Sequence, residues 1–84
     1  MTSAYNTDKN KLLERITVNQ DILGGKPIIR NKRIAVEHIL GQLAAGATSE
    51  EILEGYPFLE PADIQACLLY AYRLAAHERY EPVP

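Results

Sequence analysis

The chain has 84 residues, of which 46% are hydrophobic and 24% charged, and its formal net charge is −2. A chain of this length forms one small domain with a single modest core, too small to enclose a cofactor between two lobes. No apolar run approaches a membrane span, the N-terminus lacks the pattern of a secretory signal, and a single cysteine excludes an internal disulfide framework. We therefore expect a cytoplasmic protein without a cofactor, a bound metal or a membrane contact.

The charges divide unevenly along the chain. Residues 1–36 hold seven Lys or Arg against three acids, whereas residues 37–84 hold two against eight. Such asymmetry usually concerns what each end of a protein contacts rather than how the chain folds.

The N-terminal third predicts a small β element. Residues 1–13 are polar, and we expect a mobile segment there. Ile16-Thr17-Val18 alternates apolar and polar β-branched residues, which predicts a short strand. Further on, Asn31-Lys32 separates two apolar segments, and Asn tolerates the left-handed conformation that a two-residue turn requires. These residues predict a basic β-hairpin over 27–36.

From Val36 the apolar residues recur with helical spacing, and Gly46 is a good C-terminal stop. A second helix begins after Thr48, which forms a capping box with Glu51, and this helix ends at Tyr56-Pro57. The third helix begins at Pro61, a residue favoured at the first helical position, and runs to about His77. We therefore place one domain over 14–78 and a C-terminal tail over 79–84.

Three helices with such short connections predict a mostly α, tri-helical bundle with a short N-terminal β-strand and hairpin element. The second and third helices have helix-turn-helix proportions. This pattern is compatible with nucleic-acid binding and with plain protein interaction.

Four cations of the predicted hairpin form a candidate nucleic-acid or anion contact: Lys26, Arg30, Lys32 and Arg33. Arg30 and Arg33 flank the turn, where like charges facing each other are mildly destabilising unless an anion lies between them. That anion could be a phosphate, or it could be Glu50, Glu51 or Glu54 of the same or a neighbouring subunit. The third possibility is that these side chains are solvated and have no partner. Solvation and pairing with glutamate together outweigh contact with phosphate.

The third helix is a poor DNA reader but a good interaction element. Its first turns would present Ala62, Asp63, Gln65 and Ala66 to a groove, with Glu60 and Asp63 meeting phosphates of the same sign. One face suffices to close the bundle, and it consists of Ile64, Cys67, Leu68, Ala71, Leu74 and Ala75. The other sides are also apolar or aromatic, and we assign to a subunit or partner interface Leu69, Tyr70, Tyr72 and Ala76. A small domain with a second apolar surface implies another chain, so we expect a homodimer, unless the N-terminal strand and the tail cover this surface.

Catalysis has little support. His38 and His77 lie far apart in the sequence, and no Ser or Cys is placed to form a nucleophile pair with either of them. Cys67 falls on an apolar side of the third helix, where a buried inert thiol is expected. We predict neither catalytic residues nor a small-molecule substrate.

Several punctuated motifs over residues 16–76 resemble the bacterial family called domain of unknown function 433. They are GGKPIIRNKRIAV, AGATSEEIL, YPFL and EPADI. The chain departs from the family pattern at Asn31-Lys32, where Gly-Thr is usual, at Ala35, where Pro is usual, and at Glu60, where a capping Thr is expected. That family is similar to VapB-type antitoxins.

The resemblance implies a homeodomain-like fold and a non-enzymatic antitoxin-like module that pairs with a PIN-like toxin and binds its own promoter DNA. The alternative is a small dimeric protein-interaction adaptor without nucleic-acid binding. The two hypotheses differ in whether a PIN-like reading frame lies beside this one.

Overall fold

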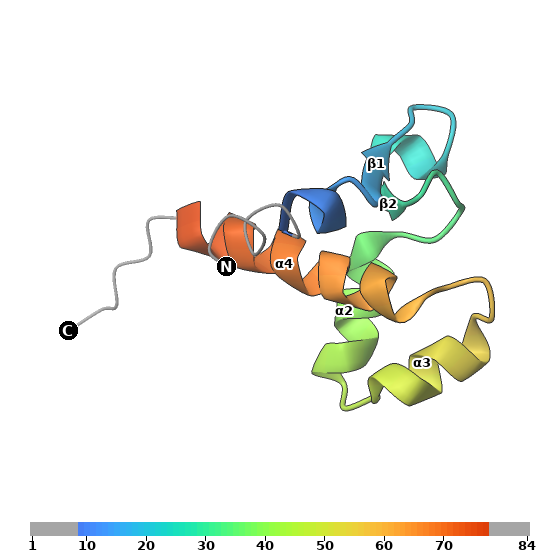
Figure 1. Ribbon diagram of the computed structural model, residues 1–84. Helices are drawn as coiled ribbons and strands as arrows, with labels where there is room; N and C mark the ends of the chain where they lie inside the picture. The colour runs from blue at the N-terminus through green and yellow to red at the C-terminus, as the bar shows by residue number, and fades with distance from the viewer. Residues whose placement is uncertain (1–8, 78–84) are drawn as a thin grey trace.

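The computed structural model describes residues 9–77 of the chain. The expected tail over 79–84 and the first eight residues of the expected mobile segment lie outside this range. Residues 9–13 of that segment are helical. The further elements are β1 (Ile16–Val18), the 3-10 turn η1 (Leu23–Gly25), β2 (Pro27–Ile29), α2 (Val36–Ala44), α3 (Ser49–Gly55) and α4 (Pro61–His77) (Figure 1). The fold is a small helical bundle with a two-stranded sheet, as the sequence predicts, and no helix among residues 9–77 is long and apolar enough to cross a membrane.

The antiparallel ladder joins different segments from those we expected. β1 pairs with β2, with Ile16 opposite Ile29 and Val18 opposite Pro27. Beyond β2, the segment over 33–36 returns alongside but forms a single bridge, between Ile28 and Ala35. The physical reason is length: α2 begins at Val36, so the returning segment becomes helical before it can extend a ladder.

The turn after β2 is shifted by one residue from the expected position. Arg30 and Asn31 both have positive φ, 45° and 58°, and the Lys32 N–H donates to the Ile29 carbonyl over 2.8 Å. Two consecutive left-handed residues are the signature of a type I′ turn. Asn adopts this conformation readily, whereas Arg adopts it at a cost in backbone strain that other contacts must offset.

The helices begin and end at the residues that the sequence indicates. After α2, Gly46 takes φ 104°, and the N–H groups of Gly46 and Ala47 donate to the carbonyls of Leu43 and Gln42. This Schellman arrangement satisfies the last carbonyls of the helix. At the start of α3, the Thr48 hydroxyl accepts from the Glu51 N–H over 3.1 Å, and the Glu51 carboxylate accepts from the Thr48 N–H over 2.8 Å. The predicted capping box is confirmed.

The core forms where α2, α3 and the first half of α4 meet the end of the sheet. Its fully or almost fully buried members are Ile28, Ile29, Val36, Ile39, Ile52 and Ile64. The outer half of α4 extends beyond this bundle (Figure 1). For this reason Leu74 is 55% exposed, whereas Leu68, next to the fully buried Cys67, is 49% exposed because it lies on the outer side of the helix. We expected both, together with the exposed Ala75, to close the bundle, and that part of the prediction is wrong.

The capping box provides a test of the helix assignment. Thr48→Ala removes the acceptor of the Glu51 N–H and should lower the free energy of unfolding by about 1 kcal/mol. Ser49→Ala, at the exposed first residue of α3, is the matched control and should change it by less than about 0.5 kcal/mol. Chemical denaturation at one fixed protein concentration measures both, because association would also shift stability. Equal stability of the two variants would contradict the role of the cap.

Candidate functional site

The carboxylate of Asp63 is fully buried at the start of α4 and joins three segments of the chain. Its Oδ1 accepts from Arg15 Nη1 over 2.9 Å and from Arg30 Nε over 3.0 Å, and its Oδ2 accepts from Arg30 Nη2 over 2.8 Å. Oδ2 also accepts from the Glu60 backbone N–H over 2.8 Å. Both oxygens are therefore hydrogen-bonded, which is the condition for tolerating a charge in the interior.

These contacts decide the ionisation of Asp63. Burial alone raises the pKa of a carboxyl group because it disfavours the charged form. At Asp63 the hydrogen bonds from Arg30, from the Glu60 N–H and from Arg15 outweigh that effect, so the pKa of Asp63 lies below its ordinary value. The group is a carboxylate at neutral pH.

The two arginines extend the network outward. Arg15 Nη1 also contacts Glu60 Oε1 at 2.7 Å, and Arg30 Nη2 donates to the Phe58 carbonyl over 2.9 Å. Arg30 thus connects the strained turn after β2 to the α3–α4 loop. The bidentate contact with Asp63 offsets the strain of its left-handed backbone. We did not anticipate this network from the sequence, where Asp63 reads as an ordinary acid in the first turn of a helix.

The four cations of the predicted hairpin do not gather on one tip. Lys26 pairs with Glu37 at 2.8 Å, and Arg30 is turned toward Asp63. The Lys32 ammonium lies 5.9 Å from the centre of the Phe58 ring. Arg33 is exposed and forms no ion pair among the residues that the structure describes. The intramolecular partners are therefore Glu37 and Asp63, rather than the acids of α3 that we considered.

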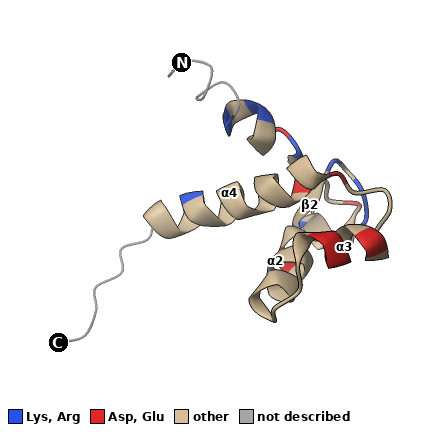
Figure 2. Cartoon of the chain, turned by 60° about the horizontal axis from the view of Figure 1, so that its bottom comes forward, with Lys and Arg blue, Asp and Glu red and all other residues tan. Residues whose placement is uncertain are grey.

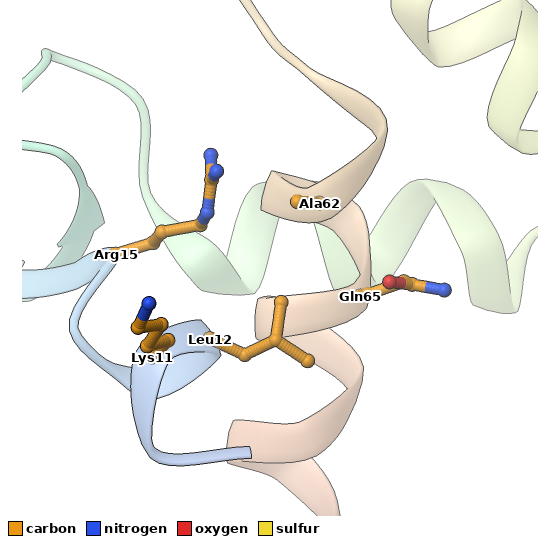
Figure 3. Close-up of a pocket in the computed structure, with 5 residues that line it drawn as sticks. All are labelled: Lys11, Leu12, Arg15, Ala62 and Gln65. Atoms are coloured by element: carbon orange, nitrogen blue, oxygen red, sulfur yellow. The ribbon is translucent and has the colours of Figure 1, made fainter. Parts of the chain in front are cut away.

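The charges of α3 and α4 bear on nucleic-acid contact. Glu50, Glu51 and Glu54 of α3 are exposed, and Figure 2 shows the acidic residues of this helix in red. In α4, Asp63 and Ala66 are fully buried, so two of the four residues that a recognition helix would present to a groove are not accessible. A pocket of about 330 Å³ lies between the first turns of α4 and the segment that follows residue 9. Figure 3 shows the residues that line it, which are Lys11, Leu12, Arg15, Ala62 and Gln65.

The residues assigned to an interface on α4 have different surroundings. Tyr72 is 64% exposed and Ala76 is exposed. Leu69 is half-buried, and Tyr70 packs against the core. Leu68, which we had placed inward, joins Tyr72 on the exposed side one turn earlier. The second apolar surface of α4 therefore exists, but with Leu68 in it and without Tyr70.

His38 is hydrogen-bonded, Cys67 is buried and His77 is exposed at the end of α4. His38 Nε2 is 2.7 Å from the Tyr56 hydroxyl. Cys67 is fully buried, and burial followed by the nearby Asp63 carboxylate raises the pKa of its thiol to about 12. At neutral pH the thiolate is scarce. Within residues 9–77 no three His, Cys, Asp or Glu residues lie together in a way that could hold a metal ion.

Comparison with known proteins agrees with the motifs. The family described as "Protein of unknown function (DUF433)" matches residues 16–71. The chain belongs to the DUF433 family. A crystal structure of a DUF433 member from Anabaena variabilis superposes with a TM-score of 0.70 at 29% identity, over 89% of this chain and 73% of that one. The uncharacterized protein y4eO of Sinorhizobium fredii is 38% identical over 58 residues, which are 69% of this chain and 26% of y4eO. This DUF433 chain thus spans about a quarter of that relative.

The buried carboxylate gives a stability prediction for this DUF433 chain. Asp63→Asn removes the charge but keeps the shape, leaving Arg30 without its anion and Arg15 with Glu60 alone. It should lower the free energy of unfolding by about 2–3 kcal/mol. Glu60→Gln, at a carboxylate that is 55% exposed, should cost less than about 1 kcal/mol. Urea titrations at neutral pH measure both, and similar losses in the two variants would contradict the central role of Asp63.

The destabilisation caused by Asp63→Asn should also depend on pH. Because the folded pKa of Asp63 lies below its unfolded value, its contribution is complete above the unfolded pKa and is lost as pH falls through the folded pKa. The destabilisation caused by Asp63→Asn should therefore shrink below about pH 4, the ordinary range of Asp. A difference between wild type and variant that stays constant down to about pH 2 would be the contrary result.

Proposed function

We propose that this DUF433 chain is a non-catalytic, antitoxin-like binding module that associates with a second copy of itself through the exposed side of α4. A PIN-like toxin is the further partner that the family resemblance suggests. The observation that carries the proposal is the composition of the outer half of α4. Leu68 and Tyr72, one turn apart on the same side of the helix, are 49% and 64% exposed, and Leu74 on the other side is 55% exposed.

The scarcity of charged side chains on α4 supports protein contact at this surface. From residue 64 to residue 77, which is most of α4, Arg73 is the single side chain with a formal charge when His is counted as neutral. Figure 2 shows this part of the helix almost free of charged residues. A helix that stays in water normally carries charges over most of its exposed side. Two copies can pair along such a surface without like-charge repulsion, and burial of each large side chain contributes about 1.5–3 kcal/mol.

Binding to promoter DNA, which the family resemblance also suggests, has less support than protein contact. The α3 acids Glu50, Glu51 and Glu54 would repel phosphates next to α4, and Lys26 and Arg30 already have acidic partners. The charge distribution therefore favours the protein-interaction form of the module over the DNA-binding form. Both forms share the dimer surface.

Light scattering after size exclusion tests the dimer surface. Wild type should have about twice the 9.4 kDa mass of the chain at micromolar concentration. Leu68→Glu and Tyr72→Glu should each give a monomer with an unchanged helical circular-dichroism spectrum, because a charge in an apolar interface is costly. Ser49→Glu, at an exposed position of α3, should remain dimeric.

A monomeric wild type, or dimeric Leu68→Glu and Tyr72→Glu variants, would contradict the assignment of α4. Co-expression with an adjacent PIN-like reading frame then tests the toxin. Copurification of the toxin with wild type supports the antitoxin form. If the toxin does not copurify, the adaptor form remains.

A further inference from the structure

A second surface, separate from α4, is a pocket of about 390 Å³. Its seven lining residues come from η1, from the segment over 33–35, from α2 and from the α3–α4 loop. None of them is acidic and none belongs to α4. The volume is suited to one or two inserted side chains rather than to a whole helix.

Two large apolar side chains stand at this pocket with much of their surface in water. Phe58 is 47% exposed and Leu23 is 37% exposed. Leu23 also has φ 49°, a left-handed conformation that glycine or asparagine adopts at lower cost. Strained backbone and exposed apolar surface both oppose stability, and both are features of binding sites.

Tyr56 and Phe58 form an aromatic wall of the pocket, and contacts behind this wall hold it in place. The Phe58 carbonyl accepts from Arg30, which is fixed by Asp63. The Tyr56 ring packs edge-to-face on Phe58 at 6.2 Å between centres and on His38 at 5.8 Å. The Tyr56 hydroxyl is also hydrogen-bonded to His38. The wall is therefore preorganised, which lowers the entropic cost of binding.

The rim of the pocket is basic. Arg33 lines it and forms no ion pair among residues 9–77, and the Lys32 ammonium lies over the outer wall formed by Phe58. These are the two cations of the original four that have no carboxylate partner within the described residues. An apolar pocket with two such cations at its edge is complementary to an apolar group flanked by negative charge.

We propose that this pocket binds an extended acidic peptide segment of a partner protein, which inserts an apolar side chain between Leu23, Tyr56 and Phe58. Carboxylates beside that side chain contact Arg33 and Lys32. A short acidic peptide segment is favoured over single-stranded nucleic acid because its few carboxylates can lie at Arg33 and Lys32. A phosphate backbone carries a charge at every nucleotide, so it would be repelled where it passes the three exposed glutamates of α3.

The probe is a random dodecapeptide display library selected on the whole wild-type chain. Enriched peptides should contain Asp or Glu next to an apolar residue, and fluorescence anisotropy gives their affinities. Phe58→Ser and Arg33→Glu should each weaken binding about tenfold or more, since one removes the wall and the other opposes the carboxylates.

Matched controls separate the pocket from the general surface. Val18→Ser removes an apolar side chain that is 60% exposed on β1, and Lys11→Glu reverses an exposed cation in the helical segment 9–13. Both should leave affinity within about twofold. Thermal melts verify that each variant folds, and if Phe58→Ser does not fold, Arg33→Glu with its Lys11→Glu control decides.

Three results would overturn the proposal: no enrichment, enriched peptides without acidic residues, or equal affinity for the pocket and control variants. An oligothymidylate that binds in a Phe58-dependent manner where peptides do not would assign the pocket to nucleic acid instead. The outcome is independent of the dimer proposal, because Leu68→Glu alters α4 and leaves every lining residue in place.

Discussion

The buried carboxylate of Asp63 is the constraint on which the arrangement of this small domain depends. It receives two guanidinium groups and a backbone N–H, so it connects the segment before β1, the turn after β2 and the start of α4. A buried charge requires such partners, and the partners in turn fix the segments that carry them. The contact with Asp63 stabilises the left-handed conformation of Arg30, and Arg30 in turn donates to the Phe58 carbonyl.

The network also explains why a basic sequence stretch does not produce a basic tip. Lys26 and Arg30 are used inside the domain, by Glu37 and Asp63, whereas Lys32 and Arg33 remain at the surface beside an aromatic wall. One stretch of sequence therefore supplies both a structural clamp and the rim of a pocket. The clamp holds the loop that carries Phe58, so the pocket depends on the buried charge although Asp63 does not line it.

Local signals were sufficient to predict the elements of the fold but not the contacts between them. The capping box at Thr48 and the helix stop at Gly46 involve residues within one turn of each other, and both are confirmed. The Asp63 network joins residues 33 and 48 positions apart, which no periodicity reveals. The turn was shifted because Arg30 takes a conformation that its residue type disfavours. Helical spacing placed Leu68 and Leu74 on a face, but it could not show that Leu68 lies at the outer side of the helix or that the bundle ends before Leu74. The proposed interface residues and the cation contacts remain predictions.

The central claim is that Arg30 and Asp63 act as one unit, and a double-mutant cycle measures this directly. Arg30→Ala, Asp63→Ala and the double variant are compared with wild type by urea denaturation at neutral pH and one fixed concentration. If the pair is a unit, the double variant loses less stability than the two single losses together, with a coupling free energy of about 1–3 kcal/mol. Losses that add to within about 0.5 kcal/mol would mean that the two side chains contribute independently, which would contradict this account.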